Sequence, residues 1–298
     1  MNGWTFTKVF EINSRLVVAD TIEQAIELYH LYSELDIRNI KQVLGEHLNY
    51  NALIAEPIVC SSQGWELTHI TFTGVDEWTD VNRLVDIQRR YPKAEFGVLM
   101  SRKWSVNGNR YPAPEVIENL HGRGLRLSAH LCGSLAREML YEHAFSNMED
   151  TFSKLLRSSC IFERIQLNVS GFNGKPTHAI APYQMKEIVI QQGDNCSLFE
   201  HCYITSGEHI AMLLDKSGGR GIDTPISAPA YAPNVHIGFA GGINPDNVID
   251  KIHDITSLPI RRFWIDMESG VRTDDRFDLD KVEDVCKKVY DEFLTVKS

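Results

Sequence analysis

Three glycine-rich stretches in the last third of the chain contain residues that could bind an anion. Residues 218–221 read Gly-Gly-Arg-Gly, residues 241–242 are Gly-Gly, and residues 269–270 are Ser-Gly. Because glycine has no Cβ, main-chain N–H groups in such turns can approach a phosphate closely, and each charge-assisted bond contributes about 1.5–3 kcal/mol. We therefore expect a small phosphorylated substrate. The predicted phosphate-binding residues are Gly241, Gly242, Ser269 and Gly270.

These stretches follow apolar runs of strand length, which is typical of the turns in a sheet of alternating strands and helices. The predicted strands are Leu67–Thr73, Ala94–Met100, Leu125–Leu131, Arg164–Val169, Ser197–Ile204, Ile210–Asp215, Val235–Ala240 and Arg262–Met267. The predicted helices are Asp76–Arg90, Glu115–Leu120, one from near Ser134, Pro182–Gln191, one capped by Asn244 with Pro245 in its first position, and Leu279–Phe293. This alternation favours a closed (β/α)8 TIM barrel over residues 64–298, with its site at the C-terminal ends of the strands.

Residues 1–63 do not fit the barrel repeat. Lys8–Ile12 and Arg15–Ala19 are predicted as short strands, and Asp20-Thr21 is predicted to cap a helix. A weaker helical segment covers Ile37–Leu48. We predict a small α/β appendage and favour a cap or a homodimer contact over a substrate- or partner-recognition module.

Composition excludes several classes of function. The 298 residues are 43% hydrophobic with no apolar stretch long enough to span a membrane, so no membrane partner is expected. A net charge of −10 argues against nucleic acid as a main partner. The six cysteines have no metal-finger spacing, and the N-terminus has no secretory segment; a cytoplasmic protein with reduced thiols and no metal site is expected.

Three motifs carry a family resemblance. They are Leu-Leu-Asp and Gly-Gly-Arg-Gly within 213–221, Ala-Gly-Gly-Ile-Asn-Pro-Asp-Asn-Val at 240–248, and Asp-Met-Glu-Ser-Gly-Val at 266–271. In order and spacing they resemble phosphoribosylanthranilate isomerase, a (β/α)8 barrel that performs an Amadori rearrangement in tryptophan biosynthesis. The resemblance extends over about residues 67–298 and is strongest from Asp215 onward. It implies an aldose–ketose isomerase without a metal or redox cofactor.

The resemblance also implies roles for single residues. Asp215 matches the general acid of the family, although a helix cap or a loop hydrogen bond would also explain a carboxylate there. Arg110 matches an arginine that holds the substrate carboxylate, with a solvated loop arginine as the alternative. Gln166 and Asn168 match polar residues that orient the substrate, and Asp266 either orients the site or is a buried structural carboxylate.

The first barrel strand departs from the family pattern. The catalytic position, where the family has a cysteine base, is Thr73 here, and a threonine hydroxyl is a far poorer base than a thiolate. Replacement bases are sought on one face of the third strand, with Cys132 preferred at the rim, and on the fifth strand. The candidates are Ser128, His130, Cys132, Glu200 and His201. The departure keeps two alternatives open: a same-fold enzyme for another phosphorylated sugar or nucleotide, and a non-catalytic phosphometabolite-binding protein.

Overall fold

The computed structural model describes residues 8–12, 15–19, 64–106, 110–141, 151–157, 161–169, 187–193, 196–206, 209–229, 232 and 235–294. The chain divides into one compact unit of residues 1–64 with 229–234 and a larger one of residues 65–228 with 235–298. In the smaller unit, β1 (Lys8–Ile12) and β2 (Arg15–Ala19) pair as an antiparallel hairpin, so both predicted strands exist. The helices predicted within residues 20–48 lie outside the described residues, and the boundary at residue 64 stays a prediction.

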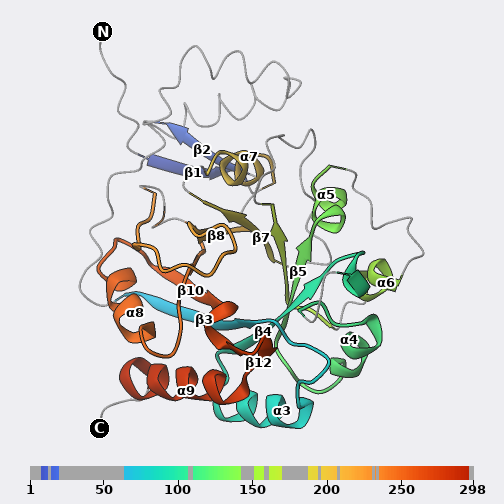
Figure 1. The fold of residues 1–298 in the computed structure, drawn as a ribbon. Helices are drawn as coiled ribbons and strands as arrows, with labels where there is room; N and C mark the ends of the chain where they lie inside the picture. Colours follow the sequence, from blue (N-terminus) through green and yellow to red (C-terminus); the bar gives the residue numbers. More distant parts are fainter. Residues whose placement is uncertain are drawn as a thin grey trace. The chain divides into compact units, whose positions relative to one another are not determined.

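Eight parallel strands close the larger unit into a barrel, because β10 pairs with both β9 and β3 (Figure 1). The strands are β3 (Glu66–Thr73), β4 (Ala94–Met100), β5 (Leu127–Cys132), β6 (Arg164–Asn168), β7 (Glu187–Gln192), β8 (Ile210–Asp215), β9 (Ile237–Ala240) and β10 (Arg262–Met267). The predicted TIM barrel is therefore confirmed. Its strands are buried on both faces, as the near-continuous apolar runs in the sequence require.

Helices lie around the outside of the barrel (Figure 1). They are α3 (Val81–Arg90), α4 (Pro114–Leu120), α5 (Ser134–Tyr141), α6 (Thr151–Arg157), α7 (Ser197–Ser206), α8 (Val248–Thr256) and α9 (Leu279–Val289), and a π-helical turn follows at Tyr290–Leu294. A short helical turn at Ser269–Val271 and the hairpin of β11 (Arg272–Thr273) with β12 (Arg276–Phe277) follow β10. Among the described residues, no helix combines the length and the apolar character that a bilayer crossing would need.

The fifth barrel strand was predicted wrongly. The helix predicted over Pro182–Gln191 is wrong because residues 187–192 form β7, and the strand predicted over Ser197–Ile204 is helix α7. The β-branched run Ile188–Ile190 is fully buried in the barrel wall, where such residues pack well. Residues 182–186 lie outside the described part. As a consequence, Glu200 and His201 belong to a helix rather than to the barrel wall.

Two helix starts also differ from prediction. Helix α3 begins at Val81, where the Asp80 carboxylate accepts hydrogen bonds from the first turn, rather than at Asp76. Helix α8 begins at Val248 instead of after Asn244, because the Asn244 side chain accepts from Asp246 N at 2.8 Å and so forms a turn of its own. Local side-chain hydrogen bonds of this kind compete with helix formation.

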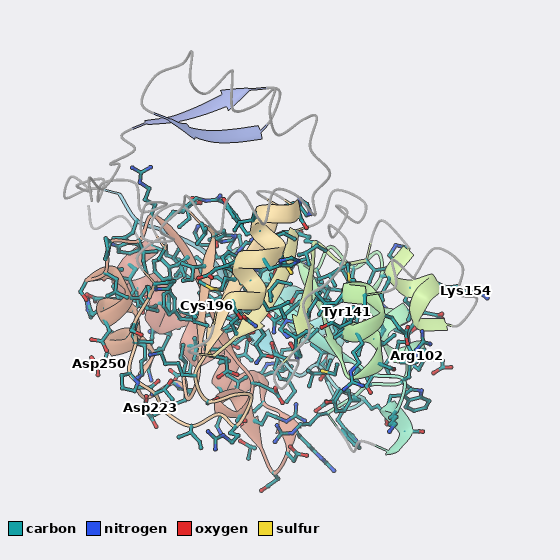
Figure 2. All side chains as sticks on the ribbon, turned by 90° about the horizontal axis from the view of Figure 1, so that it is seen from above. Arg102, Tyr141, Lys154, Cys196, Asp223 and Asp250 are labelled. Carbon is teal, nitrogen blue, oxygen red and sulfur yellow. The ribbon has the colours of Figure 1, made fainter. Side chains whose placement is uncertain are left out.

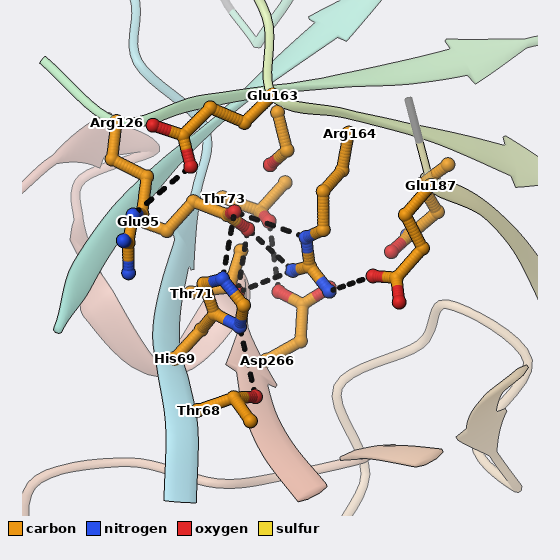
Figure 3. A network of polar contacts seen from close by, with 12 residues as sticks. Thr68, His69, Thr71, Thr73, Glu95, Arg126, Glu163, Arg164, Glu187 and Asp266 are labelled. Atoms are coloured by element: carbon orange, nitrogen blue, oxygen red, sulfur yellow. Dashed lines mark hydrogen bonds and ion pairs between the residues drawn. The ribbon is translucent and has the colours of Figure 1, made fainter. Parts of the chain in front are cut away.

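The interior of the barrel is unusually polar. Arg164 donates to Glu95 and Thr71 and contacts Glu187 (Figure 3). Its guanidinium carbon lies 4.5 Å from the centroid of the Trp264 ring. Burial opposes the ionisation of Glu95, but Arg164 outweighs it and holds the pKa of Glu95 at about 2. Barrel interiors are usually filled by Val, Ile and Leu. This one therefore contains fixed charges close below its site.

Candidate functional site

A cavity of about 500 Å³ opens at the C-terminal ends of the barrel strands. Among the candidate bases from the third and fifth predicted strands, only His130 and Cys132 line it. The other predicted site residues all line it: Thr73, Arg110, Gln166, Asn168, Asp215, Gly241, Gly242, Asp266, Ser269 and Gly270. The closed barrel explains this convergence, because parallel strands far apart in sequence end at the same rim. The geometry defines one candidate site, while the role of each residue stays a prediction.

The turns predicted to bind phosphate are in direct contact. A Cβ built on Gly270 would lie 2.0 Å from the carbonyl oxygen of Ile243, next to Gly242. A Cβ on Gly221 would lie 2.7 Å from the Ser269 hydroxyl, so the third glycine stretch reaches the same place. Gly242 itself has a φ of +71°, which favours glycine. All three glycine stretches thus converge at one edge of the cavity.

Main-chain donors are available at this edge. The first hydrogen bond of the turn Ser269–Val271 runs from Val271 N to Glu268 O, so the preceding amides of Ser269 and Gly270 open the turn. The first N–H groups of a helical turn have no partner inside it. Among the described residues, no partner for these two amides is found inside the turn, so an anion placed against residues 269–270 would meet available donors.

The segment that follows β8 covers the turn at Gly241–Gly242. A Cβ on Gly242 would lie 2.4 Å from the main chain of Asp223. Lys251 of α8 donates to the Asp223 carboxylate and to the Thr224 carbonyl, and Figure 2 shows Asp223 on the same side of the molecule as Asp250 of α8. Lys251 thus fixes the segment 222–224 in its place over the glycine turn.

Arg110 is paired within the protein. It donates to Glu268 at 2.8 Å and to Asp275 at 2.7 Å, although 37% of its side chain is exposed to solvent. Burial disfavours its charge, but the two carboxylates outweigh this and raise the pKa of Arg110. A substrate carboxylate would have to displace Glu268 or Asp275. The sequence analysis did not find Glu268, although it lies in the cavity.

Asp215 is buried and accepts hydrogen bonds from a glutamine and from its own loop. Gln191 Nε2 donates to Oδ2 at 2.8 Å, Ser217 donates to Oδ1 through both its amide and its hydroxyl, and Gly219 N donates to Oδ2. These donors occupy both carboxylate oxygens and hold the loop in place, which gives weight to the alternative of a loop hydrogen bond. Gln191 escaped the sequence analysis because its strand was read as a helix. The adjacent β-branched run Ile188–Ile190 could have indicated a strand that ends at Gln191 and Gln192.

Cys132 and His130 are weak candidates for a base. Burial, opposed by hydrogen bonds from Asn168 and Tyr111, raises the pKa of the Cys132 thiol to about 11, and only the thiolate is reactive. Burial lowers the pKa of His130 to about 3, so its ring is neutral. Ser128 lies 3.0 Å from His130 Nε2 as its hydrogen-bond partner. Glu200 and His201 are not among the residues that line the cavity.

Asp266 is a buried carboxyl group beside the cavity with a raised pKa. Its side chain is 5% exposed, lines the cavity and accepts a hydrogen bond from Thr73 Oγ1 at 2.8 Å (Figure 3). Burial raises the pKa of Asp266 to about 7, although the Thr73 bond and the charge of Arg164 act in the opposite direction. A group with this pKa can both accept and release a proton near neutrality.

No protein-family model and no curated protein matches the chain. Among solved structures it is similar to TrpF from Jonesia denitrificans, with 15% identity, coverage of 74% of this chain and 95% of that one, and a TM-score of 0.44. It is also similar to N-(5'-phosphoribosyl)anthranilate isomerase from Pyrococcus furiosus, with 14% identity, coverage of 75% of this chain and 99% of that one, and a TM-score of 0.47. A third similar structure is a truncated 3-deoxy-D-arabino-heptulosonate 7-phosphate synthase from Thermotoga maritima, with 12% identity, coverage of 78% of this chain and 91% of that one, and a TM-score of 0.45. At such identities the similarity concerns the fold alone.

Proposed function

We propose that the protein is an acid–base isomerase of a small phosphate ester, converting a phosphorylated ribosyl-amine from its aldose to its ketose form. The contact between the turns at Gly241–Gly242 and Ser269–Gly270, in a cavity that also exposes Asp266, carries this proposal. The motif resemblance adds phosphoribosylanthranilate as the first substrate to consider, together with a place in tryptophan biosynthesis and in the cytoplasm.

The cavity offers the parts that such a reaction requires. Main-chain amides at the glycine turns would hold the phosphate, and charge-assisted bonds of about 1.5–3 kcal/mol each would anchor the substrate before ordering costs are subtracted. An aldose–ketose isomerisation then needs a group that moves a proton between neighbouring carbons. A carboxyl group beside the cavity suits this task, and the reaction requires no external oxidant or reductant.

A second candidate is the isomerisation of a phosphorylated sugar that carries no carboxylate. Two observations favour it. Thr73 stands at the position of the family's cysteine base, and Arg110 is already paired with Glu268 and Asp275. Because Glu268 and Asp275 already neutralise Arg110, the site does not require a substrate carboxylate as a partner for it.

Turnover of phosphoribosylanthranilate by the purified full chain tests the proposal. The substrate is fluorescent and its product is not, so we expect a loss of fluorescence that scales with protein concentration. A parallel assay with phosphorylated aldoses lacking a carboxylate separates the second candidate from the first. Binding of these phosphate esters without conversion of any would favour the non-catalytic binding protein and contradict an isomerase.

A further inference from the structure

We propose that Asp266 is the catalytic base that moves the carbon-bound proton, and that Thr73 is a positioning residue whose hydroxyl serves Asp266 in both of its protonation states. This assignment rests on the proposed function and deepens it, because the family's cysteine position cannot supply a base here. In this assignment, Thr73 positions the base Asp266 instead of acting as the base itself.

Asp266 has one oxygen bound and one oxygen free for substrate. Asp266 is the penultimate residue of β10 and is paired in register with Thr71 of β3. Thr73 lies two residues further along β3, at its C-terminal end. Thr73 Oγ1 donates to Oδ1 at 2.8 Å. Within the described part of the chain, no group donates to Oδ2, while the residue lines the cavity. A substrate in the cavity can therefore reach this oxygen.

The surroundings of Thr73 fix which way its hydroxyl points. Gln166 Nε2 lies 3.0 Å from His130 Nδ1, and since an amide nitrogen only donates, Nδ1 is the acceptor and the ring hydrogen is on Nε2, facing Ser128. Thr73 Oγ1 lies 3.5 Å from the same Nδ1. Because Gln166 already occupies the single lone pair of Nδ1, the Thr73 hydroxyl hydrogen is directed to the Asp266 carboxylate.

This arrangement satisfies Asp266 with and without its proton. As a carboxylate, Asp266 accepts the Thr73 hydroxyl hydrogen. As an acid, it can donate to a lone pair of Thr73 Oγ1, because a hydroxyl both donates and accepts. Buried polar groups are costly when they lose their partners, so a hydroxyl that acts as donor or acceptor lowers the cost of both states. A cysteine thiol, a weak donor and acceptor, would do this less well.

Charged groups of both signs act on the pKa of Asp266. Arg164 of β6 favours the carboxylate, whereas Glu268 of the following loop and Glu95 of β4 oppose it. Arg164 is itself held by Glu95 and Glu187. Burial is the main influence, and it raises the pKa of Asp266 to about 7, the range in which a general base is most effective.

The proton transfer closes without an external oxidant or reductant. In the ring-opened imine, Asp266 removes the proton from C2, the C–H electron pair forms a C1=C2 double bond, and the imine pair moves to nitrogen, which takes a proton from solvent. Protonated Asp266 then gives its proton to C1, and the C2 hydroxyl loses its proton to solvent as the ketone forms. The substrate is rearranged, and Asp266 returns to the carboxylate.

Variants of the full chain test the assignment against the accepted substrate. Asp266→Asn should lower kcat about 10²- to 10⁴-fold, the usual contribution of a general base, with unchanged affinity for ribose 5-phosphate as proof of an intact site. Thr73→Ser keeps the hydroxyl and should retain activity. Thr73→Val should lower kcat and move the acidic limb of its pH profile upward, since the lost bond favours the carboxylate.

The outcomes separate two failures. A wild-type chain without turnover overturns the proposed function and this assignment together. A wild-type chain with turnover and an Asp266→Asn variant that keeps it overturns the assignment alone. Carbon-13 NMR titration of the aspartate carboxyls gives a readout that needs no activity: one carboxyl absent from Asp266→Asn should titrate near neutrality. A midpoint below about pH 5 for that signal would contradict the assignment.

Discussion

At the scale of single residues, the site is defined by which polar groups already have partners. Asp215 is bound by Gln191 and its own loop, and Arg110 is held by Glu268 and Asp275. Asp266 lines the cavity, and no described residue donates a hydrogen bond to its Oδ2. The family resemblance suggested Asp215 as the general acid and Arg110 as the contact for the substrate carboxylate, but both residues are hydrogen-bonded within the protein.

Ser269→Asp tests the phosphate site at this scale. Ser269 is exposed and abuts Gly221, so its replacement disturbs little of the core. A carboxylate there would repel a bound phosphate, and the affinity for ribose 5-phosphate should fall roughly tenfold or more. Ser269→Asn, similar in size but neutral, is the control. Calorimetry that finds equal affinities for the two variants would place the phosphate elsewhere.

Glu268→Gln tests whether Arg110 can serve a substrate carboxylate. Removing one of its two partners should strengthen binding of a benzoate-bearing product analogue by about fivefold, the equivalent of ~1 kcal/mol for a partly exposed ion pair. A phenyl analogue without the carboxylate should gain nothing. Glu283→Gln, which also loses arginine contacts but lies outside the cavity, is the matched control. Equal gains for both analogues would argue against an Arg110 contact.

At the scale of elements, the segment after β8 decides the shape of the phosphate edge. Residues 222–223 lie against Gly242, and Lys251 of α8 holds Asp223 and Thr224. A loop thus depends on a helix that follows a different strand. Such a dependence cannot be inferred from local patterns, since Lys251 reads as an ordinary residue of an amphipathic helix.

Lys251→Met tests this dependence. It keeps the aliphatic stem and removes the bonds to Asp223 and Thr224, so the segment should loosen while the barrel stays folded. We expect faster limited proteolysis within residues 216–229, weaker ribose 5-phosphate binding, and a stability loss of about 1 kcal/mol or less because Asp223 is largely exposed. Lys287→Met, whose partner Asp291 is on the surface, should change none of these. Unchanged proteolysis would contradict the role of Lys251.

The strands were predictable from sequence to the extent that their signals are local. Ile210–Asp215 and Arg262–Met267 are apolar runs with clear ends, and they are strands at those bounds. Most of β7 was predicted as part of a helix, because the hydrophobic periodicity of a short apolar run does not distinguish a helix from a buried strand. The contact of Thr73 with Asp266 spans 193 residues of sequence, and no local pattern can anticipate it.

At the scale of the whole molecule, the barrel combines a packed wall with a charged interior. Burial of an ion pair is costly, and removal of one partner leaves the other charge uncompensated. Arg164 and Glu95 are almost inaccessible to solvent, with 5% and 0% of their side chains exposed. The sequence predicted the closed barrel but not this interior, because the alternation of a strand does not say which polar residues will meet across it.

Arg164→Met tests the weight of this network. It leaves Glu95 buried without its cation, and we expect a loss of about 3–5 kcal/mol in the free energy of unfolding at pH 7. The double variant Arg164→Met with Glu95→Leu should recover most of that loss. Since Glu95 has a lowered pKa in the folded state, its contribution is present above its ordinary pKa and should be lost as pH falls toward about 2. Denaturant unfolding in which the double variant is no more stable than the single one would contradict a paired charge.

The claim on which the account depends most is that a phosphate ester binds where the glycine turns meet. A crystal structure of the protein with ribose 5-phosphate tests it most directly. The account predicts the phosphate against the amides of Gly242, Ser269 and Gly270, with the sugar directed toward Asp266. A phosphate bound elsewhere in the cavity, or a saturated crystal with those amides unoccupied, would contradict it.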